Sequence, residues 1–504
     1  MVNDSRLKRA KLNIVFSLGS QFVVLLCNLI IPNLLIRSFG SGAYGATTSI
    51  TRFLSFIALM EGGIGGVARA ALYKPLADND MQRISEIVSE MKKFFRMIAC
   101  FFSVYALALA CSFKYISNAD FEWTFTFGLV LAISITTFAQ YYIGITYAVL
   151  MNAAQKLYIS SMLSIFSWIL TMIFVIFLTH GGYSLVVVKL ASSVAFLLHP
   201  LGSWLYVRKH FNLVRCDTKG KNYLSQKWDG LGQHLAYHLH FQTDIAVLTI
   251  FTNLTSVAVY SVYNMIVSYM QNIIGSFTAG MEAMFGDMLA KKEYDSLKKS
   301  FDYYETMLSV IAVVLFSVTA VMIIPFVELY TAGVADASYK EPVFAVIFVL
   351  ASVLYCLRLP YHELTIAAGH FKQTNKAAYG EAAINMILSI VLLRRFGLCG
   401  VAAATVIATG FRFLYYVFYL SKNIVYRKKR LFVKRILVNA VSFMTILFAG
   451  KAFLHYVEIT NYFYWVFYAA IVTLFAGSMI MAFQMLFYRE DMMKVMKKCL
   501  SKGR

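Results

Sequence analysis

Apolar runs of 20 or more residues recur along the whole chain, and they restrict its fold more than any other feature. Each run is long enough to cross a hydrocarbon layer about 30 Å thick as a helix. Lipid offers no partner to backbone N–H and C=O groups, so only helices and closed β-barrels can span it. Barrel strands need roughly ten alternating residues, whereas runs such as 439–454 and 464–487 do not alternate. The sequence therefore predicts an all-α polytopic membrane protein.

Composition excludes a soluble fold and a nucleic-acid partner. The chain is 60% hydrophobic and 14% charged, with a mean hydropathy of +0.66, whereas soluble domains are about 25% charged. The net charge of +21 does not indicate nucleic acid, because Lys and Arg gather in alternate short loops between the apolar runs. That distribution is a topology signal.

We expect about fourteen transmembrane helices. They cover residues 12–36, 43–67, 94–116, 123–150, 157–180, 183–207, 231–252, 256–281, 303–331, 342–367, 377–393, 398–420, 435–456 and 462–487. With the N-terminus inside, roughly 35 of the 46 Lys and Arg residues fall in cytoplasmic segments. The first run is too long for a signal peptide and has no small-residue cleavage site, so we interpret it as an uncleaved span. The expected topology is multi-pass, with both termini cytoplasmic.

An internal repeat divides the chain into two halves. A shift of 216 residues carries spans one to six onto spans seven to twelve and superimposes hydropathy landmarks, for example Tyr44 on Tyr260 and Gly181 on Gly397. Six helices per half keep the orientation, so the halves are parallel repeats, and transporters of this kind bind substrate between them. The expected parts are a six-helix bundle at 1–207, a cytoplasmic connector at 208–230, a second six-helix bundle at 231–420, and helices 13 and 14 with a basic tail at 421–504.

Several glycine-rich motifs resemble one transporter family. They are Ile36-Arg37-Ser38-Phe39-Gly40 with Ala43-Tyr44-Gly45, Glu61-Gly62-Gly63-Ile64-Gly65, Gln242-Thr243-Asp244 with Val259-Tyr260-Ser261, Ala368-Gly369 with Ile384-Asn385, and Phe396-Gly397 with Gly400-Val401-Ala402. In order and spacing the chain is similar to the polysaccharide-transport branch, the Wzx-type O-antigen and capsule flippases, of the multidrug/oligosaccharidyl-lipid/polysaccharide exporter superfamily. The resemblance implies a MATE-like fold, a polyprenyl-diphosphate-linked oligosaccharide as cargo, a central cationic cavity and ion-coupled exchange.

Ionisable residues inside the spans are candidate functional residues, because a charge at a helix centre costs about 2.5–3.5 kcal/mol on insertion scales. They are Arg52, Glu61, Lys189, Asp244, Arg358, Glu363, Glu381 and Arg412. A diphosphate that leaves water needs cationic partners, and the planar guanidinium binds its oxygens in pairs. We therefore expect Arg52, Arg358 and Arg412, with Lys189, to bind substrate. The alternative is structural ion pairing, of Arg358 with Glu363 or Glu381 and of Arg52 with Asp244.

Ion coupling is expected to involve the acidic residues. Asp244 and His240 lie four residues apart and so share a helix face; His titrates near physiological pH, and a carboxylate binds either H⁺ or Na⁺. Glu61, Glu363 and Glu381 are further candidates. Interhelical hydrogen bonding is the alternative for Asp244 and His240. The pattern gives little support to a zinc site at the neighbouring histidines, because no complete ligand set is visible.

The favoured function is a flippase that carries lipid-linked oligosaccharides from the cytoplasmic to the outer leaflet of a bacterial inner membrane for capsule, O-antigen or exopolysaccharide synthesis. It is a carrier without covalent chemistry or cofactor, and no Walker motif indicates ATP drive. The expected partners are H⁺ or Na⁺, membrane lipid, a polysaccharide polymerase and a chain-length regulator. The alternatives are a multidrug or cation exporter of the same superfamily and a membrane polymerase or glycosyltransferase.

Overall fold

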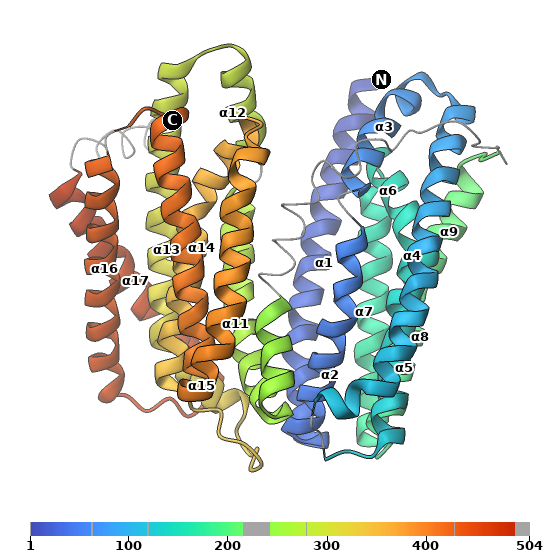
Figure 1. The fold of residues 1–504 in the computed structure, drawn as a ribbon, viewed down its shortest axis with the longest axis horizontal. Helices are drawn as coiled ribbons and strands as arrows, with labels where there is room; N and C mark the ends of the chain where they lie inside the picture. The colour runs from blue at the N-terminus through green and yellow to red at the C-terminus, as the bar shows by residue number, and fades with distance from the viewer. Residues whose placement is uncertain are drawn as a thin grey trace. The chain divides into compact units, whose positions relative to one another are not determined.

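The 504-residue chain was analysed as a computed structural model (Figure 1), which describes residues 2–61, 64–117, 120–214, 242–278, 280–427 and 429–488. Within these ranges the chain is helical and contains no strand. The N-terminal helices are α1 (Val2–Phe39), α2 (Ser41–Ser55) with a 3₁₀ turn (Phe56–Met60), α3 (Ile64–Asp78), α4 (Met81–Ile116), α5 (Trp123–Ala139), a π turn (Gln140–Gly144), α6 (Ile145–Ala153), α7 (Leu157–His180), α8 (Leu185–Phe196), α9 (Leu198–His210) and the short helix Gln242–Phe251. The C-terminal helices are α11 (Leu254–Thr278), α12 (Met281–Ala290), α13 (Tyr294–Tyr330), α14 (Pro342–Ala367), α15 (Phe371–Asn423), α16 (Lys429–His455) and α17 (Tyr462–Phe487).

The helices are those of a multi-pass membrane protein. In the described part of the chain, ten helices, with α15 counted once, are long and apolar enough to cross a membrane. The pair Ser41–Met60 and Ile64–Asp78, bent by 50°, makes eleven if it is counted as one span. The helix Gln242–Phe251 is apolar but shorter than a span. The all-α architecture expected from the apolar runs is confirmed.

The long helix α15 is two antiparallel helices. Its backbone leaves the helical region at Gly397, where φ is 56° and ψ is −136°, and Figure 1 shows the reversal. Thr405 Oγ1 lies 3.2 Å from Asn385 Oδ1, and Tyr415 donates a hydrogen bond of 3.2 Å to the carbonyl of Gln373. In one straight helix that last pair, 42 residues apart, would be about 60 Å apart. The expected spans 377–393 and 398–420 are thus separate helices joined at Gly397.

The contacts divide the chain into two compact units, 1–259 with 333–337 and 260–332 with 338–504. In the first unit, the helix Gln242–Phe251 and the start of α11 pack on α2. Ser49 Oγ lies 2.7 Å from Thr249 Oγ1. A Cβ on Gly45 would lie 1.8 Å from the carbonyl oxygen of Leu254, so the two backbones touch. Most of the expected connector 208–230 lies outside the described residues.

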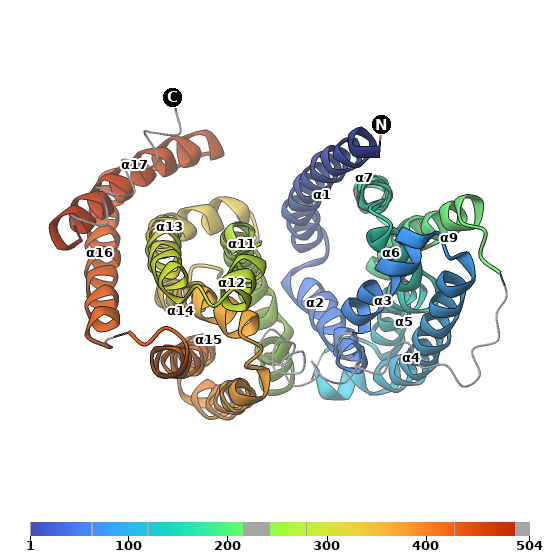
Figure 2. The same ribbon diagram turned by 90° about the horizontal axis from the view of Figure 1, so that it is seen from above.

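Within the first unit, α1 packs along α7, and α4 packs with α3 and α5 (Figure 2). Asp336, in the short segment 333–337 that belongs to this unit, satisfies the start of α2: its carboxylate accepts hydrogen bonds from the backbone N–H of Ser41 at 2.6 Å and from its hydroxyl at 2.8 Å. Such a carboxylate accepts hydrogen bonds from N–H groups of the first helical turn that have no partner within the helix, and its negative charge is favourable at a helix N-terminus.

Within the second unit, α16 and α17 pack against α13 (Figure 2). Gly450 makes the close approach possible, since a Cβ there would lie 2.6 Å from the Val321 side chain. On the other helix, Trp465 donates a hydrogen bond of 3.0 Å to the carbonyl of Met322. The last two helices therefore extend the second unit through α13.

Candidate functional site

Three buried charged side chains meet in the second unit. Arg358 extends from α14, Glu381 from the first half of α15 and Arg412 from its second half. Nη1 of Arg358 donates to both oxygens of the Glu381 carboxylate, at 2.9 and 3.0 Å, and Nη1 of Arg412 donates to Oε2 at 2.5 Å. The three residues are 5%, 0% and 4% exposed. The chain reversal at Gly397 brings Arg412 to this cluster, because it places residue 412 beside residue 381.

Aromatic and histidine side chains surround this cluster. Arg412 also donates to the Tyr416 hydroxyl at 3.1 Å, and that hydroxyl lies 3.4 Å from Nδ1 of His362. The guanidinium of Arg358 lies 4.9 Å from the centre of the Tyr355 ring, within cation–π range. Nε of Arg358 is buried and has no hydrogen-bond partner among the described residues.

Two guanidiniums and one carboxylate have a summed charge of +1. Because guanidiniums bind phosphate oxygens as well as carboxylates, an entering phosphate group would compete with Glu381 for the same donors. The arrangement also contains the ion pair that the alternative interpretation expected between Arg358 and Glu381. Glu363, the other expected partner, lies on α14 and is half-buried.

Four further predicted residues, Arg52, Glu61, Lys189 and Asp244, lie in the first unit. Arg52, on α2, donates a hydrogen bond of 3.2 Å to Gln242 Oε1. Asp244 lies two residues further along that helix and is 5% exposed. Arg52 and Asp244 are therefore on adjacent helices, as the pairing hypothesis requires.

Glu61, just before α3, hydrogen-bonds Tyr141 in the π turn. Such turns within helices are frequent at functional sites. Lys189 lies on α8 and is half-buried. His240 falls outside the described residues. No group of three or more His, Cys, Asp or Glu side chains that could hold a metal ion occurs in the ranges the structure describes.

A second charged cluster was not predicted. Glu305 and Asp302 on α13 meet Arg427 before α16 and Arg435 within it: Arg427 Nη1 lies 2.7 Å from Asp302 and 2.5 Å from Glu305, and Arg435 pairs with Glu305. Tyr361 of α14 donates a hydrogen bond to the Glu305 carboxylate. We call these five residues the α13–α16 cluster. A signal was present, since two acids three residues apart share a helix face and a basic run at 427–435 could neutralise them.

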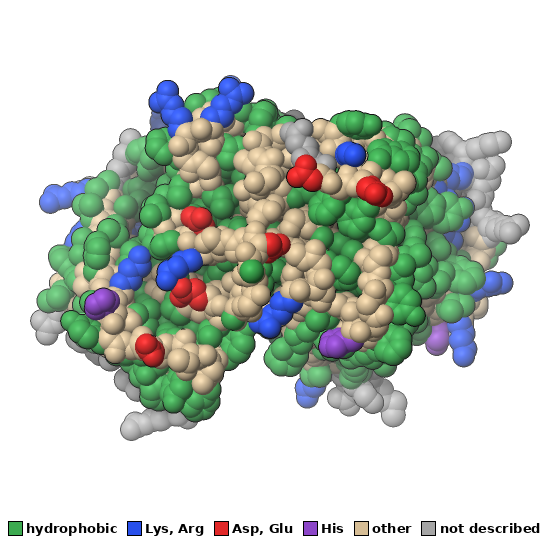
Figure 3. Space-filling view, turned by 90° about the horizontal axis from the view of Figure 1, so that it is seen from below, with side chains coloured by type: hydrophobic (Ala, Val, Ile, Leu, Met, Phe, Trp, Pro, Cys, Tyr) green, Lys and Arg blue, Asp and Glu red, His purple; other side chains and the backbone are tan. Residues whose placement is uncertain are grey.

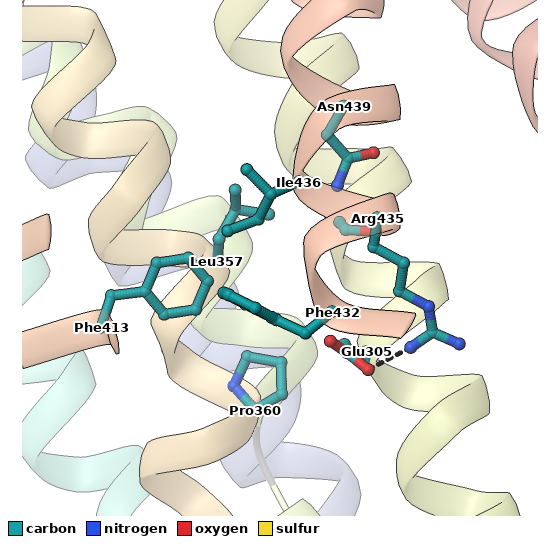
Figure 4. A pocket seen from close by; sticks show the side chains of 9 residues that line it. Glu305, Leu357, Pro360, Phe413, Phe432, Arg435, Ile436 and Asn439 are labelled. Atoms are coloured by element: carbon teal, nitrogen blue, oxygen red, sulfur yellow. Dashed lines mark hydrogen bonds and ion pairs between the residues drawn. The ribbon is translucent and has the colours of Figure 1, made fainter. Parts of the chain in front are cut away.

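The α13–α16 cluster is electrically balanced and closely packed. Its two guanidiniums and two carboxylates sum to zero. Burial lowers the pKa of Arg427, but hydrogen bonds and attraction from Glu305 outweigh this and raise the pKa above its usual value. The adjoining cavity, lined by Glu305, Pro360, Phe432 and Arg435 (Figure 4), measures about 20 Å³, room for a single water molecule. We interpret this cluster as a structural anchor.

Comparison with known proteins was made by sequence and by structure. No family model matches the sequence, and the curated proteins gave no match. Solved structures do match: the inward closed conformation of the lipid II flippase MurJ has a TM-score of 0.68 at 16% identity, covering 95% of this chain and 99% of that one. The chain has the MurJ and MATE transporter fold.

Two other transporters extend the comparison. The MATE multidrug transporter DinF-BH, in complex with R6G, gives a TM-score of 0.60 at 16% identity, covering 83% of this chain and 97% of that one. A MOP superfamily transporter from Pyrococcus furiosus, described as having a binding pocket of reverse polarity, gives 0.56 at 12% identity, covering 84% and 96%. These likenesses support the fold expected from the motifs.

Proposed function

We propose that this protein is a flippase that moves polyprenyl-diphosphate-linked oligosaccharide repeat units from the cytoplasmic to the outer leaflet of a bacterial inner membrane, for capsule, O-antigen or exopolysaccharide synthesis. The observation that carries the proposal is the pair of buried guanidiniums, Arg358 and Arg412, that share the Glu381 carboxylate. The fold supports it, because the structural relatives include a lipid II flippase along nearly the whole chain.

The proposed mechanism uses competition for these guanidiniums. A diphosphate that reaches the cluster displaces part of the hydrogen bonding between Glu381 and the arginines, and the return of the carboxylate releases the cargo. Arg52 and Lys189 contribute positive charge in the first unit. No bond is made or broken, so the protein is a carrier and not an enzyme.

Transport of this kind needs a driving force, and we propose coupling to H⁺ or Na⁺ through the carboxylates. Asp244 is 5% exposed inside the first unit, and Glu61 contacts Tyr141 at the π turn. Glu363 and Glu381 provide carboxylates in the second unit. A polymerase and a chain-length regulator would receive the exported units.

The cargo proposal is tested in proteoliposomes that contain a polyprenyl-diphosphate oligosaccharide with a fluorescent sugar, quenched from outside. Arg412→Gln keeps Glu381 paired with Arg358, so the variant should fold, yet it loses the second guanidinium. We expect its flipping rate to fall about tenfold or more, since hydrogen bonds to charged groups contribute about 1.5–3 kcal/mol. Arg412→Lys should fall less, because it keeps the charge and loses only the bidentate geometry.

The matched control is Lys291→Gln, which removes an exposed cation paired with Asp287 and should transport normally. Normal flipping by Arg412→Gln at normal protein level would contradict the proposal. The multidrug-exporter alternative predicts that a cationic dye competes with the lipid-linked oligosaccharide for transport, and the same vesicles measure that competition.

Ion coupling is tested with Asp244→Asn, which keeps the shape of the side chain and removes its charge. We expect gradient-driven flipping to be lost while the protein remains folded. The measurement is the flipping rate with an imposed H⁺ or Na⁺ gradient against the rate without one. A gradient response equal to that of the unchanged protein would remove Asp244 from the mechanism.

A further inference from the structure

A pocket of about 460 Å³ opens at the end of α9 in the first unit. Its walls come from α4, α6, α9 and the segment that follows α9; the residues used below are Lys92, Tyr147, Trp204, Arg208 and Phe211. The segment after α9 is held in place because the N–H of Val214 donates a hydrogen bond of 3.0 Å to Ser85 Oγ. The volume is in the usual range of small-molecule sites.

Two cations from different helices line this pocket. The Lys92 ammonium lies 5.0 Å from the centre of the Tyr147 ring, and the Arg208 guanidinium lies 5.5 Å from the centre of the Trp204 ring. Such contacts orient a cation and leave its N–H donors free for an anion. None of the described residues that line the pocket is acidic, and among these described residues neither cation forms an ion pair with a carboxylate.

The surroundings of the pocket are those of a membrane interface. The helices α8 and α9 form an apolar span, Leu185–His210, that ends in the basic turn Arg208-Lys209-His210. Trp near the end of a span, followed by Lys and Arg, is typical of a cytoplasmic interface. A third cation lies close by, since Lys156 Nζ is 4.7 Å from the centre of the Phe211 ring.

An exposed apolar row leads to Arg208. Leu201 and Leu205, which are 41% and 57% exposed, precede it by seven and three residues and therefore lie on the same face of α9. The row ends where the pocket begins. A molecule with a hydrocarbon chain along the leucines would place a polar group next to Arg208.

We propose that this pocket binds the phosphate headgroup of an anionic phospholipid from the cytoplasmic leaflet, with an acyl chain lying along Leu201 and Leu205. Basic pockets between membrane-spanning helices on the cytoplasmic side bind anionic headgroups. The proposal is independent of the flippase function, because none of these residues belongs to the Arg358–Glu381–Arg412 cluster.

The first test measures phospholipid binding to the purified full-length protein by native mass spectrometry, with phosphatidylglycerol and phosphatidylcholine as probes. Lys92→Gln and Arg208→Gln should each weaken phosphatidylglycerol binding about fivefold, as expected for one basic residue near an anionic surface, and leave phosphatidylcholine binding unchanged. The control is Lys209→Gln, an exposed cation in the same turn that does not line the pocket. Unchanged phosphatidylglycerol binding in Arg208→Gln, or an equal loss in the control, would overturn the proposal.

A second measurement tests the lipid site without substituting its charged residues. In nanodiscs, brominated phosphatidylglycerol should quench a part of the tryptophan fluorescence that Trp204→Phe eliminates. Millimolar inorganic phosphate should not relieve this quenching, because the acyl chain holds the lipid beside the pocket. Relief by phosphate would assign the pocket to a soluble anion, and quenching that does not depend on Trp204 would place the lipid elsewhere; either result refutes the lipid site.

Discussion

At the scale of residues, the two buried charged clusters of the second unit differ in charge balance. Arg427 and Arg435 meet two carboxylates, whereas Arg358 and Arg412 share the single carboxylate of Glu381. Buried ion pairs stabilise little in net terms, because desolvation cancels most of the attraction, but removing one partner is costly. The balanced cluster suits a permanent contact, and the shared carboxylate suits an exchange of partners.

This difference predicts an asymmetric response to mutation at the shared carboxylate. Arg412→Gln leaves Glu381 paired with Arg358 and should cost little stability. Glu381→Gln leaves both buried guanidiniums without this carboxylate and should lower the free energy of unfolding by about 3–5 kcal/mol. Thermal unfolding in detergent, followed by tryptophan fluorescence, measures both.

The triple variant Glu381→Gln with Arg358→Gln and Arg412→Gln completes this experiment. It removes all three charges and should recover most of the stability that Glu381→Gln loses. A triple variant that is less stable than Glu381→Gln would show that the cluster is held by packing and not by charge.

The sequence predicted the buried charges more completely than their partners. The cost of a charge in a span selected Arg358, Glu381 and Arg412, and Glu381 was one of two acids expected near Arg358. The involvement of Arg412 in the same contact depends on the chain reversal at Gly397, which fixes the register of the two halves of α15. Glu305 was missed because it lies near the end of its span, where a charge costs less and so gives a weaker signal.

At the scale of elements, a charged contact at one turn of α13 adds to the attachment of α16. The Glu305 carboxylate contacts Arg427, Arg435 and Tyr361, so it links α13 and α14 with the start of α16. Elsewhere along α13, Gly450 of α16 approaches the Val321 side chain closely, and Trp465 of α17 donates a hydrogen bond to the Met322 carbonyl.

We therefore expect Glu305→Gln to loosen α16 from α13. Both guanidiniums lose a buried carboxylate, which should cost about 3–5 kcal/mol, and amide hydrogen exchange in α16 should become faster. The control is Asp302→Asn, whose side chain is 35% exposed and whose loss solvent can screen. Equal exchange in α16 for Glu305→Gln and the unchanged protein would refute the anchor.

Helices were predictable from the sequence because lipid admits only helices and closed β-barrels, and the apolar runs do not alternate as barrel strands do. The two halves of α15 were expected as separate spans around Gly397, and the structure shows why: Gly397 adopts a positive φ, and a Cβ on Gly400 would lie 2.3 Å from the Leu392 carbonyl oxygen. The 3₁₀ and π turns within the N-terminal spans could not be predicted. Each is only five residues long, and the spacing of apolar residues does not show where a helix tightens or widens over one turn.

At the scale of the whole molecule, the charge asymmetry of the loops predicts orientation. Figure 3 shows the end of the helices at which α13 finishes, where acidic and basic side chains are interspersed. The sequence places its excess of Lys and Arg in the loops of the opposite side, and by the positive-inside rule we propose that this side is cytoplasmic.

Reporter fusions should confirm this orientation. Alkaline phosphatase joined after Lys219, in the expected cytoplasmic loop, should be inactive, and the same enzyme joined after Ala335, between α13 and α14, should be active. The paired sites control for expression, since both fusions carry the same reporter. Phosphatase activity at Lys219 would reverse the proposed topology.

The two compact units are defined by contacts, whereas the two halves of the repeat are defined by sequence similarity. The expected second bundle starts at 231, and the contacts group 242–259 with the first unit. The reason is local packing: Gly45 lets α2 touch the backbone at Leu254, and the Ser49–Thr249 contact adds a buried hydrogen bond. Sequence similarity reflects the common origin of the two halves, whereas the contacts reflect which segments pack together in the folded chain.

The paired halves of α15 also have a consequence for biosynthesis. A segment with Glu381 and one with Arg412 would each carry a charge into the bilayer if they left the translocon singly, at about 2.5–3.5 kcal/mol apiece. Joined by the turn at Gly397, they can enter lipid as one preformed hairpin in which the two charges are already neutralised at 2.5 Å. We therefore expect the hairpin, and not the single helix, to be the unit of membrane insertion for this part of the chain.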